Sequence, residues 1–422
     1  MLSTYRFYQK YQILNMICHF APISRKRLIE LTGLRPTSIG DLTKELLDEG
    51  LIMESGFYSA GPGRKQILLD INRQYLCALA ISFAETGVTY TVVQFDGEIV
   101  LTKEQAMPVF SDDVKLPELM EQQIAEVLQQ TSGRLVVGIG LCAPVYGSAG
   151  FGKAPMTVSY DEFLNRLHTS LHGHLENAFS IPVYSFGTAS LPALAEHRFG
   201  CAVGCDHFLC VELSNGLGVS IFSNGKAITG ASNMAGELGH TVLYTSDAQS
   251  ATPCYCGKTG CVEQTASFLH IQKVLQDAIQ NGVTTALQQR PEPDQPLCVS
   301  DIREAVEKHD SLCMRYVRQA ARRAGIAIAN AVTLLNPKRV VLYGFMLELG
   351  EYYISILKNT ILENMMSFPA GFEVCISQST ENLLPLGAAA EMFSVFLKME
   401  DHRWIYQLPH DDYMEDAEDS GQ

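Results

Sequence analysis

The sequence has no hydrophobic run that approaches the roughly 18 consecutive apolar residues needed to cross a membrane. It also has no N-terminal apolar stretch followed by a small-residue cleavage site, as a secretory signal peptide would have. These absences predict a cytoplasmic protein without membrane contact. In that compartment its 12 cysteines are expected to be reduced thiols and metal ligands rather than disulfides.

Basic residues are scarce as well. The chain has 31 Lys and Arg against 46 Asp and Glu, which gives a formal net charge of -15 at pH 7. This charge argues against non-specific binding of nucleic acid by the whole protein. Residues 1–70 are nevertheless slightly basic, whereas residues 400–422 are strongly acidic. The uneven charge predicts DNA contact that is confined to the N-terminal end.

The first 72 residues are predicted to form a winged helix-turn-helix domain. The spacing of apolar and helix-capping residues predicts three helices, over residues 3–20, 25–32 and 36–50. Ser24 is placed to cap the second helix, and Pro36 opens the third, where its missing N–H costs nothing. Two strand-like segments follow, joined by Gly-Pro-Gly-Arg-Lys at residues 61–65, a sequence that is typical of a β-wing.

In such a domain the third helix is predicted to enter the major groove of double-stranded DNA, and the wing tip to reach phosphates or the minor groove. The residues expected to contact DNA are Thr37, Ser38, Asp41, Lys44, Arg64 and Lys65. Asp41 can accept a hydrogen bond from cytosine but repels phosphate. The alternative is a helix-turn-helix that is used only for protein contact.

The rest of the chain, long enough for one or two more domains, contains a repeated pattern. Residues 77–107 and 208–230 both read as a strand, a glycine-bearing turn, a second strand, an Asp-Gly or Asn-Gly turn, and a third strand. Each copy is followed by alternating helices and strands. The repetition predicts a duplicated α/β body.

A cluster of cysteines lies in the second half of that body. Cys254, Cys256 and Cys261 are spaced C-x-C-x4-C, and His240 precedes them by fourteen residues. Three thiolates and an imidazole form a ligand set suited to tetrahedral Zn²⁺. The alternative is a group of unrelated buried cysteines, since free cysteine is often a core residue. The interleaved glycines and the short spacing favour a structural zinc site.

The same stretch carries a family resemblance. G-E-x-G-H at residues 236–240 and C-x-C-G-x-x-G-C-x-E at residues 254–263 resemble the signature of the ROK family of repressors, open reading frames and sugar kinases. The resemblance implies that His240 and the three cysteines bind zinc. It also implies that Glu237, His240 and Glu263 reach the hydroxyls of a sugar, a role that suits carboxylates and an imidazole fixed by a metal-bound loop.

The resemblance also implies the fold of the body, the two-lobed actin-like ATPase fold. Residues 73–200 would form the first α/β lobe, joined by the C-terminal helix at about 384–400. Residues 201–383 would form the second lobe with the zinc motif, and residues 401–422 an acidic tail outside the match. The predicted fold class is therefore α/β, with a winged helix-turn-helix before this body.

Departures from the family pattern bear on catalysis. The kinase motif Glu-Asn-Asp-Ala-Asn aligns with residues 186–190, so Thr188 stands where the kinases carry the catalytic Asp, and Gly187 replaces a sugar-binding Asn. Threonine cannot act as a general base near neutral pH. The first phosphate turn carries Glu85, which would repel phosphate. No catalytic residue is therefore assigned, and kinase activity is predicted to be lost.

Together these features predict a sugar-responsive DNA-binding transcriptional regulator, a repressor of carbohydrate genes that works as a homodimer or higher homo-oligomer. The effector of the body would be a small sugar-like molecule or a partner protein. Two alternatives remain: an ATP-dependent ROK sugar kinase with an accessory DNA-binding head, and a degenerate regulator that binds no sugar. The missing general base distinguishes the regulator from the kinase.

Overall fold

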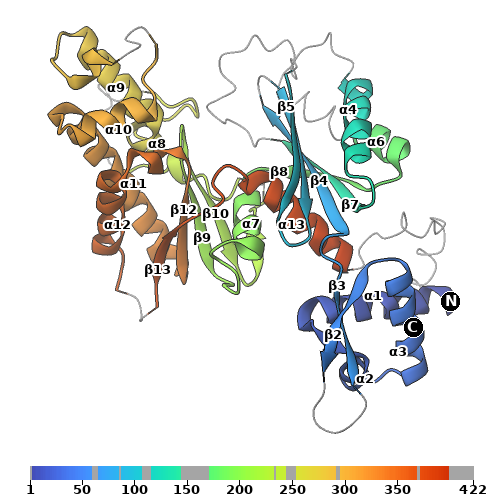
Figure 1. The fold of residues 1–422 in the computed structure, drawn as a ribbon. Helices are drawn as coiled ribbons and strands as arrows, with labels where there is room; N and C mark the ends of the chain where they lie inside the picture. The colour runs from blue at the N-terminus through green and yellow to red at the C-terminus, as the bar shows by residue number, and fades with distance from the viewer. Residues whose placement is uncertain are drawn as a thin grey trace, which may run out of the picture. The chain divides into compact units, whose positions relative to one another are not determined.

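The computed structural model describes residues 2–58, 65–84, 87–106, 116–143, 171–231, 234–243, 253–290, 295–367 and 371–398 (Figure 1). The chain forms two compact units. Unit 1 comprises Met1–Cys142, Thr157–Phe186 and Ala388–Gln422, and unit 2 comprises Ala143–Met156 and Gly187–Gly387. Within the described ranges, no helix is long and apolar enough to span a bilayer.

The N-terminal part of unit 1 is a winged helix, as predicted. Its elements are α1 (Leu2–Phe20), β1 (Ile23–Ser24), α2 (Arg25–Thr32), α3 (Pro36–Asp48), β2 (Ile52–Tyr58) and β3 (Gln66–Ile71). The three strands form one antiparallel sheet in the order β1-β3-β2.

The short helices of this winged-helix head, residues 2–71, begin and end at residues whose local conformation or side chain suits a helix end. The hydroxyl of Ser24 accepts a hydrogen bond from the backbone N–H of Arg27 at 3.3 Å, which satisfies a free donor at the start of α2. Gly33 then ends α2 in the left-handed region, with φ of 68°, and its N–H donates to the carbonyl of Ile29. Pro36 occupies the first turn of α3.

The remainder of unit 1 is built on a five-stranded sheet in the order β6-β5-β4-β7-β8. Its elements are β4 (Leu76–Ala84), β5 (Gly87–Gln94), β6 (Ile99–Ala106), α4 (Leu116–Gln130), β7 (Leu135–Ala143), α6 (His172–Phe179), β8 (Val183–Gly187) and α13 (Leu383–Lys398), which belongs to unit 1 from Ala388 onward. Helix α13 packs closely on this sheet. A Cβ atom at Gly140 of β7 would lie only 3.0 Å from the side chain of Met392 of α13, so glycine at this position leaves room for it.

Unit 2 contains a second five-stranded sheet in the order β11-β10-β9-β12-β13. Its strands are β9 (Phe208–Leu213), β10 (Leu217–Ser223), β11 (Lys226–Ile228), β12 (Arg339–Tyr343) and β13 (Glu373–Ile376). Its helices are α7 (Leu191–Phe199), η2 (Leu238–His240), α8 (Glu263–Ala266), α9 (Phe268–Gln280), η3 (Ala286–Gln289), α10 (Val299–Glu307), α11 (Ser311–Leu335), η4 (Phe345–Leu349) and α12 (Glu351–Asn364).

The two sheets repeat one topology. In each, the first three strands form an antiparallel meander, and the fourth strand adds to the first in parallel. The sequence repeat at residues 77–107 and 208–230 corresponds to these two meanders. The predicted α/β body with two related sheets, of the actin-like ATPase type, is therefore confirmed.

Helices cover both faces of the sheet in unit 2. Phe208, Cys210 and Val341 lie on the face that packs against α7. The alternate residues of the same strands pack against α11 and α12, since successive side chains of a strand point to opposite faces. Because α7 packs on this sheet, the change from unit 1 to unit 2 falls at Gly187, before the expected lobe boundary at residue 200.

Candidate DNA-binding helix and metal-binding loop

Helix α3 presents a row of exposed residues on the side away from the core of the head. It buries Ile39 and Leu42, among others, and exposes Thr37, Asp41 and Lys44. These three residues lie within about 60° of one another around the helix axis, because each residue advances by about 100°. Ser38 lies about 100° away from Thr37 and is half-buried, so it stands beside this row rather than in it.

Ion pairs with α1 neutralise the acidic side of α3. Arg6 pairs with Glu45 and Lys10 pairs with Glu49. The bond to Glu45 raises the pKa of the Arg6 guanidinium, and the nearby charge of Asp41 adds to this effect. The pairs hold α3 against α1 and leave less free negative charge beside the exposed row.

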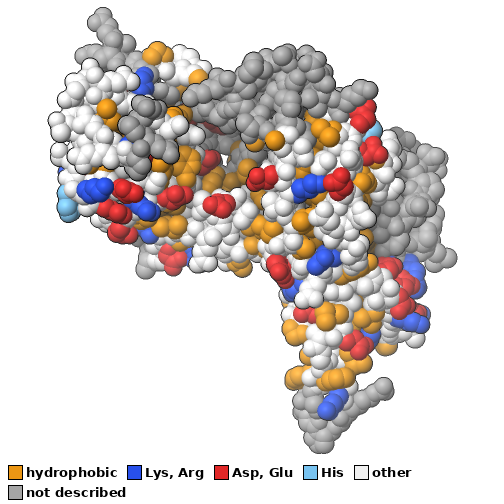
Figure 2. All heavy atoms as spheres, turned by 45° about the horizontal axis from the view of Figure 1, so that its top comes forward, with side chains coloured by type: hydrophobic (Ala, Val, Ile, Leu, Met, Phe, Trp, Pro, Cys, Tyr) orange, Lys and Arg blue, Asp and Glu red, His pale blue; other side chains and the backbone are white. Residues whose placement is uncertain are grey.

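The winged helix has exposed cations that are not held in ion pairs. Among the described residues, Lys44 and Lys65 have no ion-pair partner, and both are exposed. Lys26, in the first turn of α2, and Arg35, directly before α3, share these properties, although the sequence interpretation did not select them; their position at the starts of two helices of the helix-turn-helix was the available signal. Arg64 lies outside the described residues. Over the face shown in Figure 2, basic and acidic side chains are otherwise interspersed.

The loop of unit 2 brings the four predicted metal ligands together. The ligand atoms of His240, Cys254, Cys256 and Cys261 all lie within 4.8 Å of one another. The Sγ atoms of Cys256 and Cys261 are 3.5 Å apart, as are the Sγ of Cys254 and the Nδ1 of His240. A tetrahedron with metal–sulfur bonds of about 2.3 Å has edges of about 3.8 Å, so the arrangement fits a four-coordinate metal ion.

Tight turns aim the thiols at one point. The N–H of Cys254 donates to the carbonyl of Lys258 at 2.8 Å, and Gly257 between them has φ of 84°, a conformation that favours glycine. The backbone N–H of Lys258 stabilises the thiolate of Cys256 and lowers its pKa, whereas burial raises the pKa of Cys261 to about 12. A bound cation would favour the thiolate form of all three cysteines.

The two ring nitrogens of His240 face different partners. Nδ1 faces Cys254, and Nε2 lies 2.8 Å from the hydroxyl of Tyr255 and 3.6 Å from Oε2 of Glu237. Metal binding at Nδ1 leaves the proton on Nε2, which makes this nitrogen a hydrogen-bond donor. Tyr255 was not singled out from the sequence, because nothing in the C-x-C pattern indicates where the intervening side chain lies.

Glu263 is the third member of the predicted hydroxyl-binding set. Its carboxylate is buried and accepts a hydrogen bond from the N–H of Leu217 at 3.3 Å. Burial raises the pKa of Glu263, and the bond from Leu217 opposes this shift. Glu263 borders a hollow of about 150 Å³ whose other lining residues are Asn215, Tyr255, Gln264, Ser267, Leu269, His270 and Lys273.

Two glycines of the G-E-x-G-H motif permit this close packing. A Cβ atom at Gly236, where φ is 98°, would lie 1.9 Å from the carbonyl oxygen of Val219. A Cβ atom at Gly239 would lie 2.6 Å from the carbonyl oxygen of Leu217 and 3.1 Å from the carboxylate of Glu263. The motif therefore needs glycine so that η2 can lie directly against β10.

The segment expected to carry catalysis in a kinase is a turn before α7. Thr188 is half-buried in this turn, and the exposed Gly187 precedes it. The hydroxyl of Ser220 in β10 donates to the carbonyl of Ala189, which fixes the turn to the sheet of unit 2. Glu85 lies outside the described residues.

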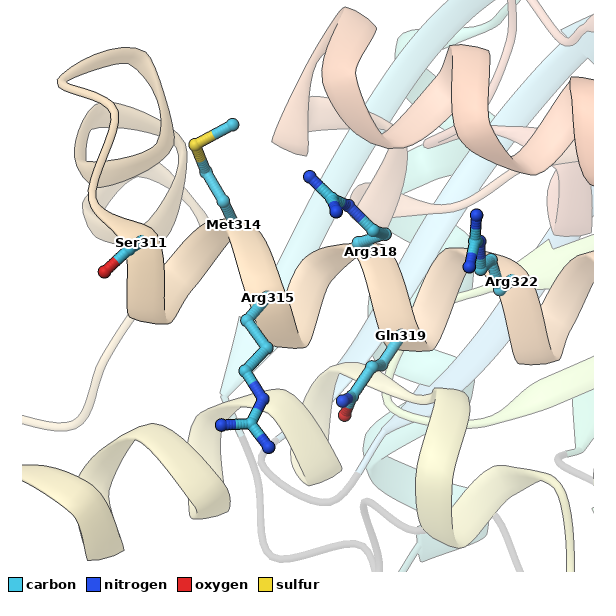
Figure 3. A pocket seen from close by; sticks show the side chains of 6 residues that line it. All are labelled: Ser311, Met314, Arg315, Arg318, Gln319 and Arg322. Atoms are coloured by element: carbon cyan, nitrogen blue, oxygen red, sulfur yellow. The ribbon is translucent and has the colours of Figure 1, made fainter.

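A separate basic surface lies on α11. It borders an open hollow of about 390 Å³ lined by Ser311, Met314, Arg315, Arg318, Gln319 and Arg322. Arg318 and Arg322 extend to one side of the helix and Arg315 to the other (Figure 3). The guanidinium of Arg318 donates to the hydroxyl of Tyr352 at 2.8 and 3.0 Å. Within the described ranges, Arg315 and Arg322 have no carboxylate partner.

The chain therefore combines a winged-helix head, a type of domain that binds DNA, with an α/β body of two sheets of one topology and a Cys₃His loop. The model of the ROK family matches residues 78–392, and the chain belongs to this family.

Similar proteins include regulators and kinases. The chain is 26% identical over 400 residues to the xylose repressor of Caldicellulosiruptor bescii, covering 93% of this chain and 97% of that protein. It is 24% identical over 351 residues to the DNA-binding transcriptional dual regulator NagC of Escherichia coli (strain K12), covering 83% of each.

Two solved structures have a similar fold. A ROK family transcriptional regulator, a homologue of the E. coli MLC protein, superposes with a TM-score of 0.74 at 23% identity and covers 92% of this chain and 96% of its own. The ROK hexokinase from Thermus thermophilus superposes with a TM-score of 0.61 at 22% identity and covers 76% of this chain and 99% of its own.

Proposed function

We propose that this protein is a sugar-responsive transcriptional repressor of carbohydrate genes, which acts on DNA in the cytoplasm. The observation that carries the proposal is the winged-helix head, with an exposed row on α3, attached to a ROK body. Relatives named xylose repressor and NagC, matched over most of their length, support it.

In this proposal α3 enters the major groove and the wing follows the phosphate backbone. Thr37, Asp41 and Lys44 face the bases or the groove edges, and Ser38 lies at the side of the helix. Arg64 and Lys65 contact phosphates at the wing. Lys26 and Arg35 add phosphate contacts at the starts of α2 and α3, because they are exposed cations without ion-pair partners among the described residues.

The metal of the Cys₃His loop is proposed to be a structural zinc ion. Three thiols and one imidazole match the ligand preference of Zn²⁺, and four protein ligands leave no open position for catalysis. When bound, zinc would supply folding energy to this loop. His240 and the three cysteines would hold it, and Lys258 would keep its ammonium on the carbonyl of His240, where it lies at 3.2 Å.

The effector is proposed to be a sugar that is bound through its hydroxyls. Nε2 of His240 would donate one hydrogen bond, and the carboxylates of Glu237 and Glu263 would accept others. The hydroxyl of Tyr255 already contacts Nε2 of His240, so a sugar hydroxyl would displace it or bind beside it. The hydrogen bond from the N–H of Leu217 fixes the position of the Glu263 carboxylate.

Phosphoryl transfer is not part of the proposal. Thr188 in the turn before α7 supplies a hydroxyl where sugar activation needs a general base. The similarity to the hexokinase shows the fold alone, and it leaves about a quarter of this chain unmatched.

The protein is proposed to act as a homodimer. A homodimer that places two heads on adjacent half-sites would couple sugar binding to DNA affinity.

The test combines DNA binding, sugar binding and turnover. Fluorescence anisotropy with genomic fragments upstream of carbohydrate genes should show binding that a sugar weakens, and calorimetry with hexoses, pentoses and amino sugars should identify that sugar. An ADP-release assay with the same sugars should show no turnover. Turnover near the 1–10³ s⁻¹ typical of enzymes would favour the kinase alternative. DNA binding that no sugar changes would favour the degenerate regulator.

A further inference from the structure

Two cysteines outside the metal loop form a close pair in unit 2. Cys201 and Cys375 are 174 residues apart in sequence, and their Sγ atoms lie 3.1 Å apart. Both residues are half-buried. A disulfide has a sulfur–sulfur bond of about 2.05 Å, so a movement of about 1 Å would join them.

The two thiols meet because of the packing of α7 on its sheet. Cys375 in β13 is the register partner of Val341, which in turn is the partner of Cys210, so all three side chains lie on the face covered by α7. Cys201 follows the C-terminal end of α7. Its N–H donates to Oε2 of Glu196 at 2.8 Å, which fixes its backbone to the end of α7.

A proton acceptor accompanies the pair. Oε2 of Glu196 lies 3.2 Å from Sγ of Cys201, within reach of the thiol proton. Burial is the main cause that raises the pKa of the Cys201 thiol, with Cys375 and Glu196 adding to it. The thiolate is the reactive form, so oxidation of the pair depends on removal of the thiol proton, for which the carboxylate of Glu196 is placed.

We propose that Cys201 and Cys375 are a redox-modification site, at which a hydroperoxide such as hydrogen peroxide converts the two thiols to a disulfide. The sulfur of Cys201 attacks one peroxide oxygen, the O–O bond breaks, and the thiol proton passes by way of Glu196 to the departing hydroxide, which leaves as water. The sulfur of Cys375 then attacks the resulting sulfenic acid. The S–O bond breaks, the S–S bond forms, and the proton of Cys375 leaves with the second water.

The disulfide would fasten the end of α7 to the edge strand β13. Helix α7 starts directly after the turn that contains Thr188, and Ser220 holds the other side of that turn. Oxidation would therefore fix both ends of α7 to the same sheet. A third thiol, that of Cys210, is fully buried in the same cluster. In the metal-binding loop, the Sγ atoms of Cys256 and Cys261 are also only 3.5 Å apart. These are the competing sites that the experiment must separate.

The experiment treats the full-length, metal-loaded protein with hydrogen peroxide, alkylates the remaining thiols after denaturation, and maps the peptides by mass spectrometry. The expected result is a cross-linked pair of peptides containing Cys201 and Cys375, a loss of two free thiols per chain, and a mass decrease of about 2 Da that dithiothreitol reverses. Metal content measured in parallel should stay constant while this link forms.

Three variants complete the test. Cys201→Ser and Cys375→Ser should each abolish the cross-link, whereas Cys298→Ser, at an exposed cysteine far from the pair in sequence, should leave it unchanged. The wild-type map decides the matter even where a variant fails to fold. Full alkylation of both peptides after oxidation, or links that join them to Cys210 or to the metal-loop cysteines instead, would overturn the proposal.

Discussion

The ring of Tyr11 in α1 meets the ring of Phe396 in α13 edge to face, with centroids 6.0 Å apart and planes at 80°. Both side chains are buried. One turn earlier in α13, Phe393 lies 4.9 Å from Phe95, which follows β5 of the first sheet. Within unit 1, the last described helix of the chain therefore contacts both the winged-helix head and the sheet of the body.

Removing either ring of the Tyr11–Phe396 pair should destabilise unit 1. Tyr11→Ala and Phe396→Ala are each expected to lower the free energy of unfolding by about 3–5 kcal/mol, the usual cost of deleting a buried aromatic side chain. Tyr8→Ala, at an exposed tyrosine of the same helix, is the control and should cost less than about 1 kcal/mol. Urea unfolding measures all three. A double mutant whose loss equals the sum of the single losses would show that the two rings do not interact.

Cys256→Ser should reduce the metal content and the stability of unit 2. Removing one of four ligands weakens a structural zinc site, and the binding energy of the metal contributes to folding. Elemental analysis should find about one zinc per wild-type chain and less than about half of that in the variant. Cys298→Ser is the matched control and should keep its metal. A wild-type chain purified without metal would contradict the prediction.

Replacing Arg64 and Lys65 together with Ala should weaken DNA binding equally for all operator variants. Each lost phosphate contact reduces the salt dependence, so the slope of log K against log salt should fall by about 1–2. Ser38→Ala and Lys44→Ala are expected to change the preference among operator variants instead. Lys308→Ala, at an exposed lysine directly after α10, serves as control. Unchanged affinity and salt slope in the double variant would refute the proposed wing contact.

Gly236→Ala should disrupt the loop that carries Glu237 and His240. The added Cβ would lie 1.9 Å from the carbonyl oxygen of Val219, and the positive φ adds strain of about 1–3 kcal/mol. Gly173→Ala is the control, because nothing lies within 4 Å of its Cβ position. Thermal unfolding and sugar calorimetry should both show a loss for the first variant only. A stable Gly236→Ala protein with normal metal content would contradict the close packing of η2 on β10.

Protonation of His270 should destabilise unit 2 in acid. Burial, together with the charges of Arg323 and Lys273, lowers the pKa of His270 from 6.5 to about 4. Between these two pH values the unfolded chain binds a proton at this histidine and the folded chain does not. The free energy of unfolding therefore falls as the pH drops from about 6.5 to about 4. His270→Gln should flatten this part of the curve relative to the wild type, whereas His19→Gln, at an exposed histidine, should not. Urea midpoints measured from pH 4 to 8 provide the comparison.

The metal loop and the winged helix could be predicted because their determinants are local. The cap at Ser24, Pro36 in the first turn of α3 and the spacing of Cys254, Cys256 and Cys261 act within a few residues, so the sequence itself shows them. The repeated meander could be predicted for the same reason. In these segments short-range chemistry decides the conformation.

The remaining features depend on packing between distant segments. The contact of Tyr255 with Nε2 of His240, the meeting of Cys201 with Cys375 and the place of Phe396 beside Tyr11 follow from the tertiary fold. The half-buried position of Ser38 depends on how far α3 is rotated against α1, and periodicity alone leaves this rotation uncertain by a residue or so.

The discontinuity of unit 1 has a consequence for synthesis. The ribosome delivers the head and the first sheet early, yet the part of α13 from Ala388 onward, which covers Tyr11 and Phe95, emerges only after the long segment Gly187–Gly387 of unit 2. Domains tend to fold as they emerge, so unit 2 should close on the nascent chain while unit 1 still exposes apolar surface. Binding of chaperones to arrested chains should therefore persist until α13 has left the tunnel. A messenger truncated before Ala388 would yield a repressor head on an open core, which proteases should remove before it reaches an operator.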